Sequence, residues 1–96
     1  MGAQLEKRLV VAICNRQGLH ARPCHALVTV ANSFAGELRI SAGAHEVNGK
    51  SILELMTLNA SCGTELEIRA IGEGAELVLE ELQKLVRSGF GEELQG

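Results

Sequence analysis

The chain changes from an apolar strand pattern to a helical pattern at Gly18-Leu19-His20-Ala21-Arg22-Pro23-Cys24. Proline is tolerated in an α-helix only within the first turn, where its missing N–H would have no partner inside the helix. Pro23 therefore predicts a helix that begins near His20 or Ala21. Gly18 gives the incoming backbone the freedom to turn tightly, so a strand, a short loop and a helix are expected in that order.

The same stretch gathers groups that bind an anion. The unpaired N–H groups of a first helical turn, here that of Ala21, and the positive end of the helix dipole favour negative charge. Arg22 adds a guanidinium whose donors suit phosphate oxygens. A neutral imidazole is a nucleophile near pH 7, so His20 can accept a phosphoryl group that Gly18, Ala21 and Arg22 then stabilise. The alternative is that His20 merely caps the helix and Arg22 is a solvated surface charge.

Strand and helix patterns alternate through the first half of the chain. Residues 9–14 form an apolar, β-branched run, typical of a strand buried by neighbours on both sides. The period then becomes helical from His20 until Gly36. One face of this helix is expected to carry Leu27, Val30, Ala31 and Phe34. Alternation over 37–41 and a turn before 45–48 predict a hairpin, with Leu38 and Ile40 facing the core.

The second half predicts a short helix from Ser51 to near Leu58, a strand over 65–71 with one solvated face, and a last helix between Gly72 and Gly89. The tail after Phe90 is expected to be frayed. The element order is thus β-α-β-β-α-β-α, and strands with one apolar face require all helices to cover the same side. This order predicts an α+β fold, an open-faced α/β sandwich, as one domain over residues 1–96.

Two separated motifs, Gly18–Pro23 and Asn48–Met56, closely resemble those of the HPr family, the histidine-containing phosphocarrier proteins of the bacterial phosphotransferase system. The resemblance covers nearly the whole chain. It implies a four-stranded antiparallel sheet with three helices on one face and the site at one edge. Cys24 and His25 depart from the family, which usually carries small residues such as alanine after the proline.

The resemblance also implies a function and partners. His20 would accept a phosphoryl group, on Nδ1 in the family, from enzyme I and pass it to an A component of enzyme II or to a nitrogen-branch regulator. Such a carrier is not an independent enzyme, needs no cofactor, and is expected to be a monomer. The alternative is a regulatory binding module, as in the nitrogen-type branch, that acts through protein contacts; some relatives of this fold lack the active histidine.

Ser51 has both a structural and a regulatory interpretation. Ser51-Ile52-Leu53-Glu54 fits a capping box, in which Ser51 and Glu54 each satisfy the other's backbone N–H group. In the family, the serine at this place can be phosphorylated by a dedicated kinase, HPr kinase/phosphorylase. Ser51 is therefore also a candidate phosphosite, where added charge would change partners more than fold.

A relay protein must bind several partners briefly, which requires an exposed apolar patch beside its site. The candidates are Ile52, Leu53 and Met56, because the short helix has apolar residues on more than one side and methionine adapts to different partners. The alternative is that Ile52 and Met56 belong to the core.

The amino-acid composition argues against several other classes of protein. A net charge of −3 and the lack of Trp and Tyr do not suit nucleic-acid binding. The sequence has no signal-peptide core or membrane-spanning run, and its three cysteines are an odd number, which together favour a cytoplasmic protein. Cys24 is interpreted as a small apolar residue rather than a reactive thiol. With His20 and His25 it offers metal-ligating atoms, but no second ligand cluster supports a metal site.

Overall fold

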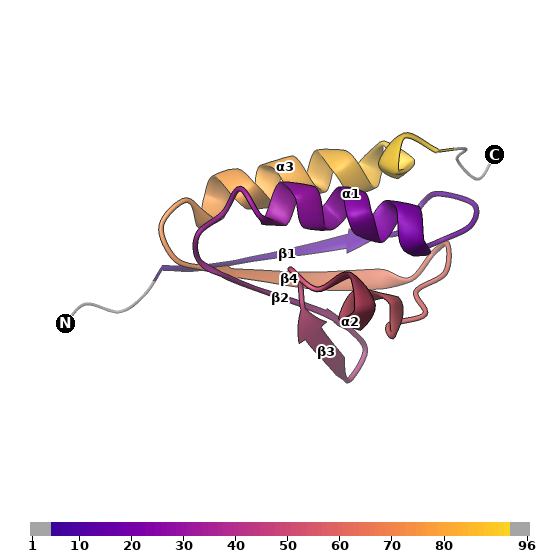
Figure 1. Cartoon of the computed structure of the whole chain (residues 1–96), viewed down its shortest axis with the longest axis horizontal. Helices are drawn as coiled ribbons and strands as arrows, with labels where there is room; N and C mark the ends of the chain where they lie inside the picture. Colours follow the sequence, from indigo (N-terminus) through magenta and orange to yellow (C-terminus); the bar gives the residue numbers. More distant parts are fainter. Residues whose placement is uncertain (1–4, 93–96) are drawn as a thin grey trace.

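The computed structural model describes residues 5–92, and it has the predicted element order (Figure 1). The elements are β1 (Glu6–Ala12), α1 (Ala21–Ala31), β2 (Glu37–Ala42), β3 (His45–Asn48), α2 (Ile52–Met56), β4 (Glu65–Ile71), α3 (Ala75–Arg87) and a 3₁₀ turn (Gly89–Gly91). Residues 1–4 and 93–96 lie outside the description, and with them part of the N-terminal and tail predictions. No helix within residues 5–92 is long and apolar enough to cross a membrane.

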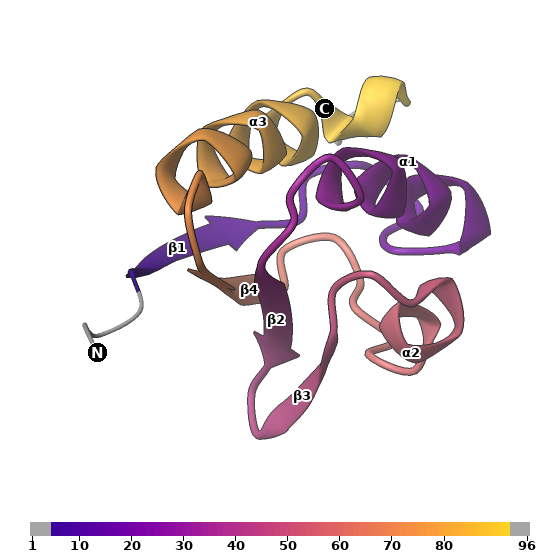
Figure 2. The same cartoon turned by 60° about the vertical axis from the view of Figure 1, so that its left-hand side comes forward.

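The four strands form an antiparallel sheet in the order β1-β4-β2-β3. Ile68 of β4 pairs with Leu9 of β1 on one side and with Ile40 of β2 on the other. Helices α1 and α3 lie next to each other across one face, while the short α2 lies beside β3 and α1 (Figures 1 and 2). The predicted open-faced sandwich is thus confirmed.

Alternation along the strands explains why only one face is covered. Leu38, Ile40, Leu66, Ile68 and Ala70 are all buried beneath the helices, as predicted. The helices contribute apolar stripes to the same core, chiefly through Leu27, Ala31, Val78, Leu82 and Val86. Removal of this apolar area from water is the main force that holds the layers together.

Two predictions about the first elements were wrong. Strand β1 is not buried on both sides, because within the described chain it pairs with β4 alone and its Val10 side chain is 59% exposed on the open face. Helix α1 ends at Ala31 rather than near Gly36. The Ser33 hydroxyl donates to the Val30 carbonyl and Phe34 N–H donates to the Ala31 carbonyl, and these tight local bonds replace further helical ones.

Candidate functional site

A loop between β1 and α1 is fastened to the segment after α2. The Leu19 N–H donates to the Ala60 carbonyl at 2.8 Å, and the Asn15 side chain, which is fully buried, donates from Nδ2 to the Gly18 carbonyl at 2.8 Å. Helix α1 then begins at Ala21 with His20 as its N-cap, in extended conformation. The predicted helix start is confirmed. The loop fixes the position of the His20 backbone, and so the point from which its side chain projects.

Gly18 is the residue that allows this close approach. Its φ is +73°, and a Cβ built on it would lie 2.5 Å from the Ala60 carbonyl oxygen. Residues other than glycine rarely adopt such a φ, and Cβ atoms in proteins essentially never come so near to a backbone oxygen. The prediction that Gly18 permits a tight turn is confirmed.

The first turn of α1 is open to an anion. Among the described residues, the N–H groups of Ala21 and Arg22 have no acceptor, Pro23 has no N–H, and the Cys24 N–H bonds back to the His20 carbonyl. The Arg22 side chain is exposed and makes no ion pair within residues 5–92. Two backbone donors and one guanidinium are therefore free for a ligand.

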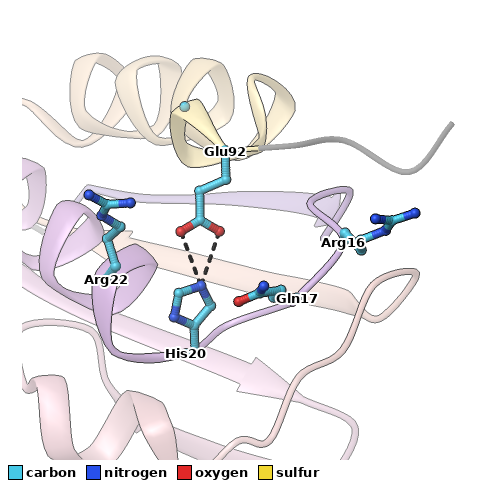
Figure 3. A pocket seen from close by; sticks show the side chains of 6 residues that line it. Arg16, Gln17, His20, Arg22 and Glu92 are labelled. Carbon is cyan, nitrogen blue, oxygen red and sulfur yellow. Dashed lines mark hydrogen bonds and ion pairs between the residues drawn. The ribbon is translucent and has the colours of Figure 1, made fainter.

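These groups border a pocket of about 290 Å³, lined by Arg16, Gln17, His20, Arg22, Gly91 and Glu92 (Figure 3). The His20 side chain is 36% exposed, and its Nε2 lies 3.0 Å from Oε2 and 3.1 Å from Oε1 of Glu92. Of the two arginines that line the pocket, Arg22 is the one whose charge acts on the Glu92 carboxylate. The pocket therefore already holds one negative group next to His20 and Arg22.

Comparison with known proteins shows the family of the chain. A family model described as "PTS HPr component phosphorylation site" matches residues 7–88. The chain belongs to the HPr family. It is 35% identical to the phosphocarrier protein HPr of Treponema pallidum over 83 residues, which cover 86% of this chain and 94% of that protein. It is 33% identical to the phosphocarrier protein NPr of Shewanella violacea over 82 residues, 85% of this chain and 90% of that protein.

Solved structures of the HPr family share the fold. A crystal structure of HPr from Thermoanaerobacter tengcongensis superposes with a TM-score of 0.87 at 36% identity, and the match covers 92% of this chain and 99% of that one. The sheet and the helices described above are therefore those of an HPr protein.

Glu92 and Asn15 are site residues that sequence reasoning missed. The prediction of a frayed tail after Phe90 fails for the described part, because Glu92 is only 16% exposed and bonds both His20 and Asn15 Nδ2. Burial raises the pKa of the Glu92 carboxyl, but the hydrogen bonds from His20 and Asn15 and the charges of His20 and Arg22 lower that pKa by more, so it lies below its ordinary value. No periodic pattern in the tail points to this contact.

The second motif forms only half of the predicted capping box. Ser51 is the N-cap of α2, and its Oγ accepts a hydrogen bond of 3.2 Å from the Glu54 N–H. The Glu54 carboxylate instead accepts from the Asn48 N–H, because the Ser51 N–H is already bonded to the Asn48 carbonyl. Ser51 is half-buried and lines neither the His20 pocket nor the groove described next.

The three apolar candidates of α2 have different surroundings. Leu53 is 80% exposed and Met56 is 40% exposed, whereas Ile52 is half-buried and packs against the core. A groove of about 310 Å³ extends from His20 to Met56 along Leu19 and Ala60. The structure thus places Met56 and His20 along the same groove and leaves Leu53 on the outer surface of the helix.

Cys24 is a core residue, as predicted. It is fully buried, and burial raises the pKa of its thiol to about 11. Within residues 5–92, no group of three or more His, Cys, Asp or Glu side chains is arranged to hold a metal ion.

The backbone conformation and close contacts of Gly18 predict how a substitution there changes the free energy of unfolding. Gly18→Ala should lower the free energy of unfolding by about 3 kcal/mol, because a positive φ and a collision with the Ala60 carbonyl add together. Gly43→Ala is the matched control: φ is also positive there (+61°) but nothing lies within 4 Å, so a loss of about 1 kcal/mol is expected. Urea unfolding measures both, and equal losses would contradict the assigned role of Gly18.

Proposed function

We propose that His20 is a phosphoryl relay that accepts a phosphoryl group from the phosphohistidine of enzyme I and passes it to a histidine of a downstream A component. The observation that carries the proposal is the half-exposed imidazole of His20 at the start of α1. It lies beside two N–H groups that have no acceptor within residues 5–92 and lines the same pocket as Arg22. Membership of a phosphocarrier family supports the same role.

The surroundings suit a phosphate carried on the ring. Its oxygens can accept from the N–H groups of Ala21 and Arg22 and from the Arg22 guanidinium, while the helix dipole adds a favourable field. Gly18 contributes by allowing the loop to place His20 there. Since the imidazole supplies the nucleophile and the protein supplies the positive charge, the transfer needs no cofactor or metal from this chain. Without donor and acceptor proteins it turns over no substrate, so it is a carrier rather than an enzyme.

The acceptor could belong to either branch of the system, and each has support. Similarity to an NPr protein favours a regulatory role in the nitrogen-type branch. Pro23 and Ser51 favour the sugar-type pattern, in which the acceptor is a sugar-specific A component. The sugar-type carrier is the proposed function, and the nitrogen-type regulatory module is the second candidate.

Loss of His20 tests the relay. With labelled phosphoenolpyruvate and enzyme I, the wild type and His45→Ala should gain acid-labile label, and His20→Ala should gain none. Arg22→Ala should slow labelling about 10- to 100-fold, since a charge-assisted hydrogen bond to phosphate is lost. An unlabelled wild type, with enzyme I itself phosphorylated, would overturn the proposal and leave regulation through Ser51 as the leading function.

The docking surface for enzyme I and the acceptors is proposed to be Leu53 and Met56, with Ile52 supporting them from the core side. Met56 lines the groove that starts at His20, Leu53 is exposed on the same helix, and exposed apolar side chains suit brief, repeated contacts. Leu53→Ala should lower kcat/KM for labelling by enzyme I about tenfold, through KM. Leu77→Ala, an exposed leucine of α3, is the control and should leave kcat/KM unchanged. Equal values for the two variants would exclude Leu53 from the interface.

Ser51 is proposed as a regulatory phosphosite. Phosphorylation would add about two negative charges at the start of α2, one residue from Ile52 and two from Leu53, and so would weaken apolar docking there. Incubation with HPr kinase and ATP should add the mass of one phosphoryl group to the wild type and to Ser33→Ala, an exposed-serine control, but not to Ser51→Ala. No mass gain in the wild type would refute the phosphosite.

A further inference from the structure

The C-terminal turn places a carboxylate on the proposed relay residue. Glu92 follows the 3₁₀ turn Gly89–Gly91. Its carboxylate oxygens are hydrogen-bonded to His20 Nε2, although 72 residues separate the two in the sequence (Figure 3). Glycines at 89 and 91 have positive φ, and Phe90 between them is buried against the core. The turn is therefore anchored, and it directs Glu92 back over the imidazole.

Asn15 fixes the orientation of this carboxylate. The side chain of Asn15 is fully buried, and its Nδ2 donates both to the Gly18 carbonyl at 2.8 Å and to Glu92 Oε1 at 3.0 Å. One amide group thus joins the loop that carries His20 to the turn that carries Glu92. A buried amide N–H group costs stability unless it is hydrogen-bonded, and Nδ2 has two acceptors, while Oδ1 has no partner within residues 5–92.

The contact determines where the imidazole proton lies. Glu92 is held in its ionised form by its neighbours, and an ionised carboxylate only accepts hydrogen bonds. The Nε2 atom must therefore carry the proton. In a neutral imidazole this leaves the lone pair on Nδ1, which has no hydrogen-bond partner within residues 5–92 and lies on the ring side away from Glu92 (Figure 3).

We infer that Glu92, oriented by Asn15, is a positioning residue that directs phosphoryl transfer to Nδ1 of His20 and stabilises the charge that the ring gains. The inference rests on the proposed function of His20 as the relay. The Nδ1 lone pair forms the new N–P bond while the donor's bond to phosphorus breaks and its electron pair stays with the donor. Nε2 keeps its proton, so the ring becomes cationic next to the Glu92 carboxylate.

Chemical phosphorylation with phosphoramidate tests this inference without any protein partner. The P–N bond of the reagent breaks, ammonia leaves, and the product is phosphohistidine, whose Nδ1 and Nε2 isomers NMR distinguishes. The variants are Glu92→Gln, which removes the charge, and Glu92→Ala, which also uncovers Nε2. Glu80→Ala, an exposed glutamate of α3, is the matched control.

The wild type and Glu80→Ala should give the Nδ1 isomer of His20 alone. Glu92→Gln should form that isomer about 3- to 10-fold more slowly, and Glu92→Ala should also yield the Nε2 isomer. If both Glu92 variants match the wild type in rate and isomer, or if they react faster, the inference is overturned and Glu92 only fills an anion pocket. Failure of the proposed function looks different, because it leaves the wild type unlabelled by enzyme I whatever phosphoramidate does.

Discussion

The hydrogen bond from the Leu19 N–H to the Ala60 carbonyl is the constraint on which the site depends. It holds the loop before α1 against the segment after α2, and only glycine at position 18 permits so close an approach. The bond places His20 at the open end of α1 and also at the end of the groove that leads to Met56. One backbone contact therefore joins the proposed relay residue to the proposed docking surface.

Local patterns in the sequence were sufficient to predict most of the fold. Pro23 located the start of α1, and strict alternation located β4 and its buried face, because both signals depend on the residues themselves. The exposure of Val10 could not be predicted in this way, since it follows from the edge position of β1 in the sheet. Asn15 and Glu92 were missed for a similar reason: 77 residues separate them, and only the tertiary structure brings them together.

The protein combines a buried core that fixes the backbone with functional side chains that are exposed to partners. Buried leucine and isoleucine side chains fix the sheet and both long helices, whereas the groups proposed to bind phosphate or partners lie at the surface: His20, Arg22, Leu53 and Met56. A carrier needs this division, because each partner must reach the phosphoryl group and then leave. Glu92 is the exception, since it covers one nitrogen of His20 and leaves the other open.

NMR of the chain before and after phosphorylation by enzyme I would test whether a phosphoryl group on His20 is held by the start of α1. We expect coupling between phosphorus and the His20 ring, with the largest amide shifts at Ala21 and Arg22, whose N–H groups gain an acceptor. Phosphorus coupled to another residue would rule out His20 as the relay, and unchanged amide shifts of Ala21 and Arg22 would show that the start of α1 does not hold the phosphoryl group.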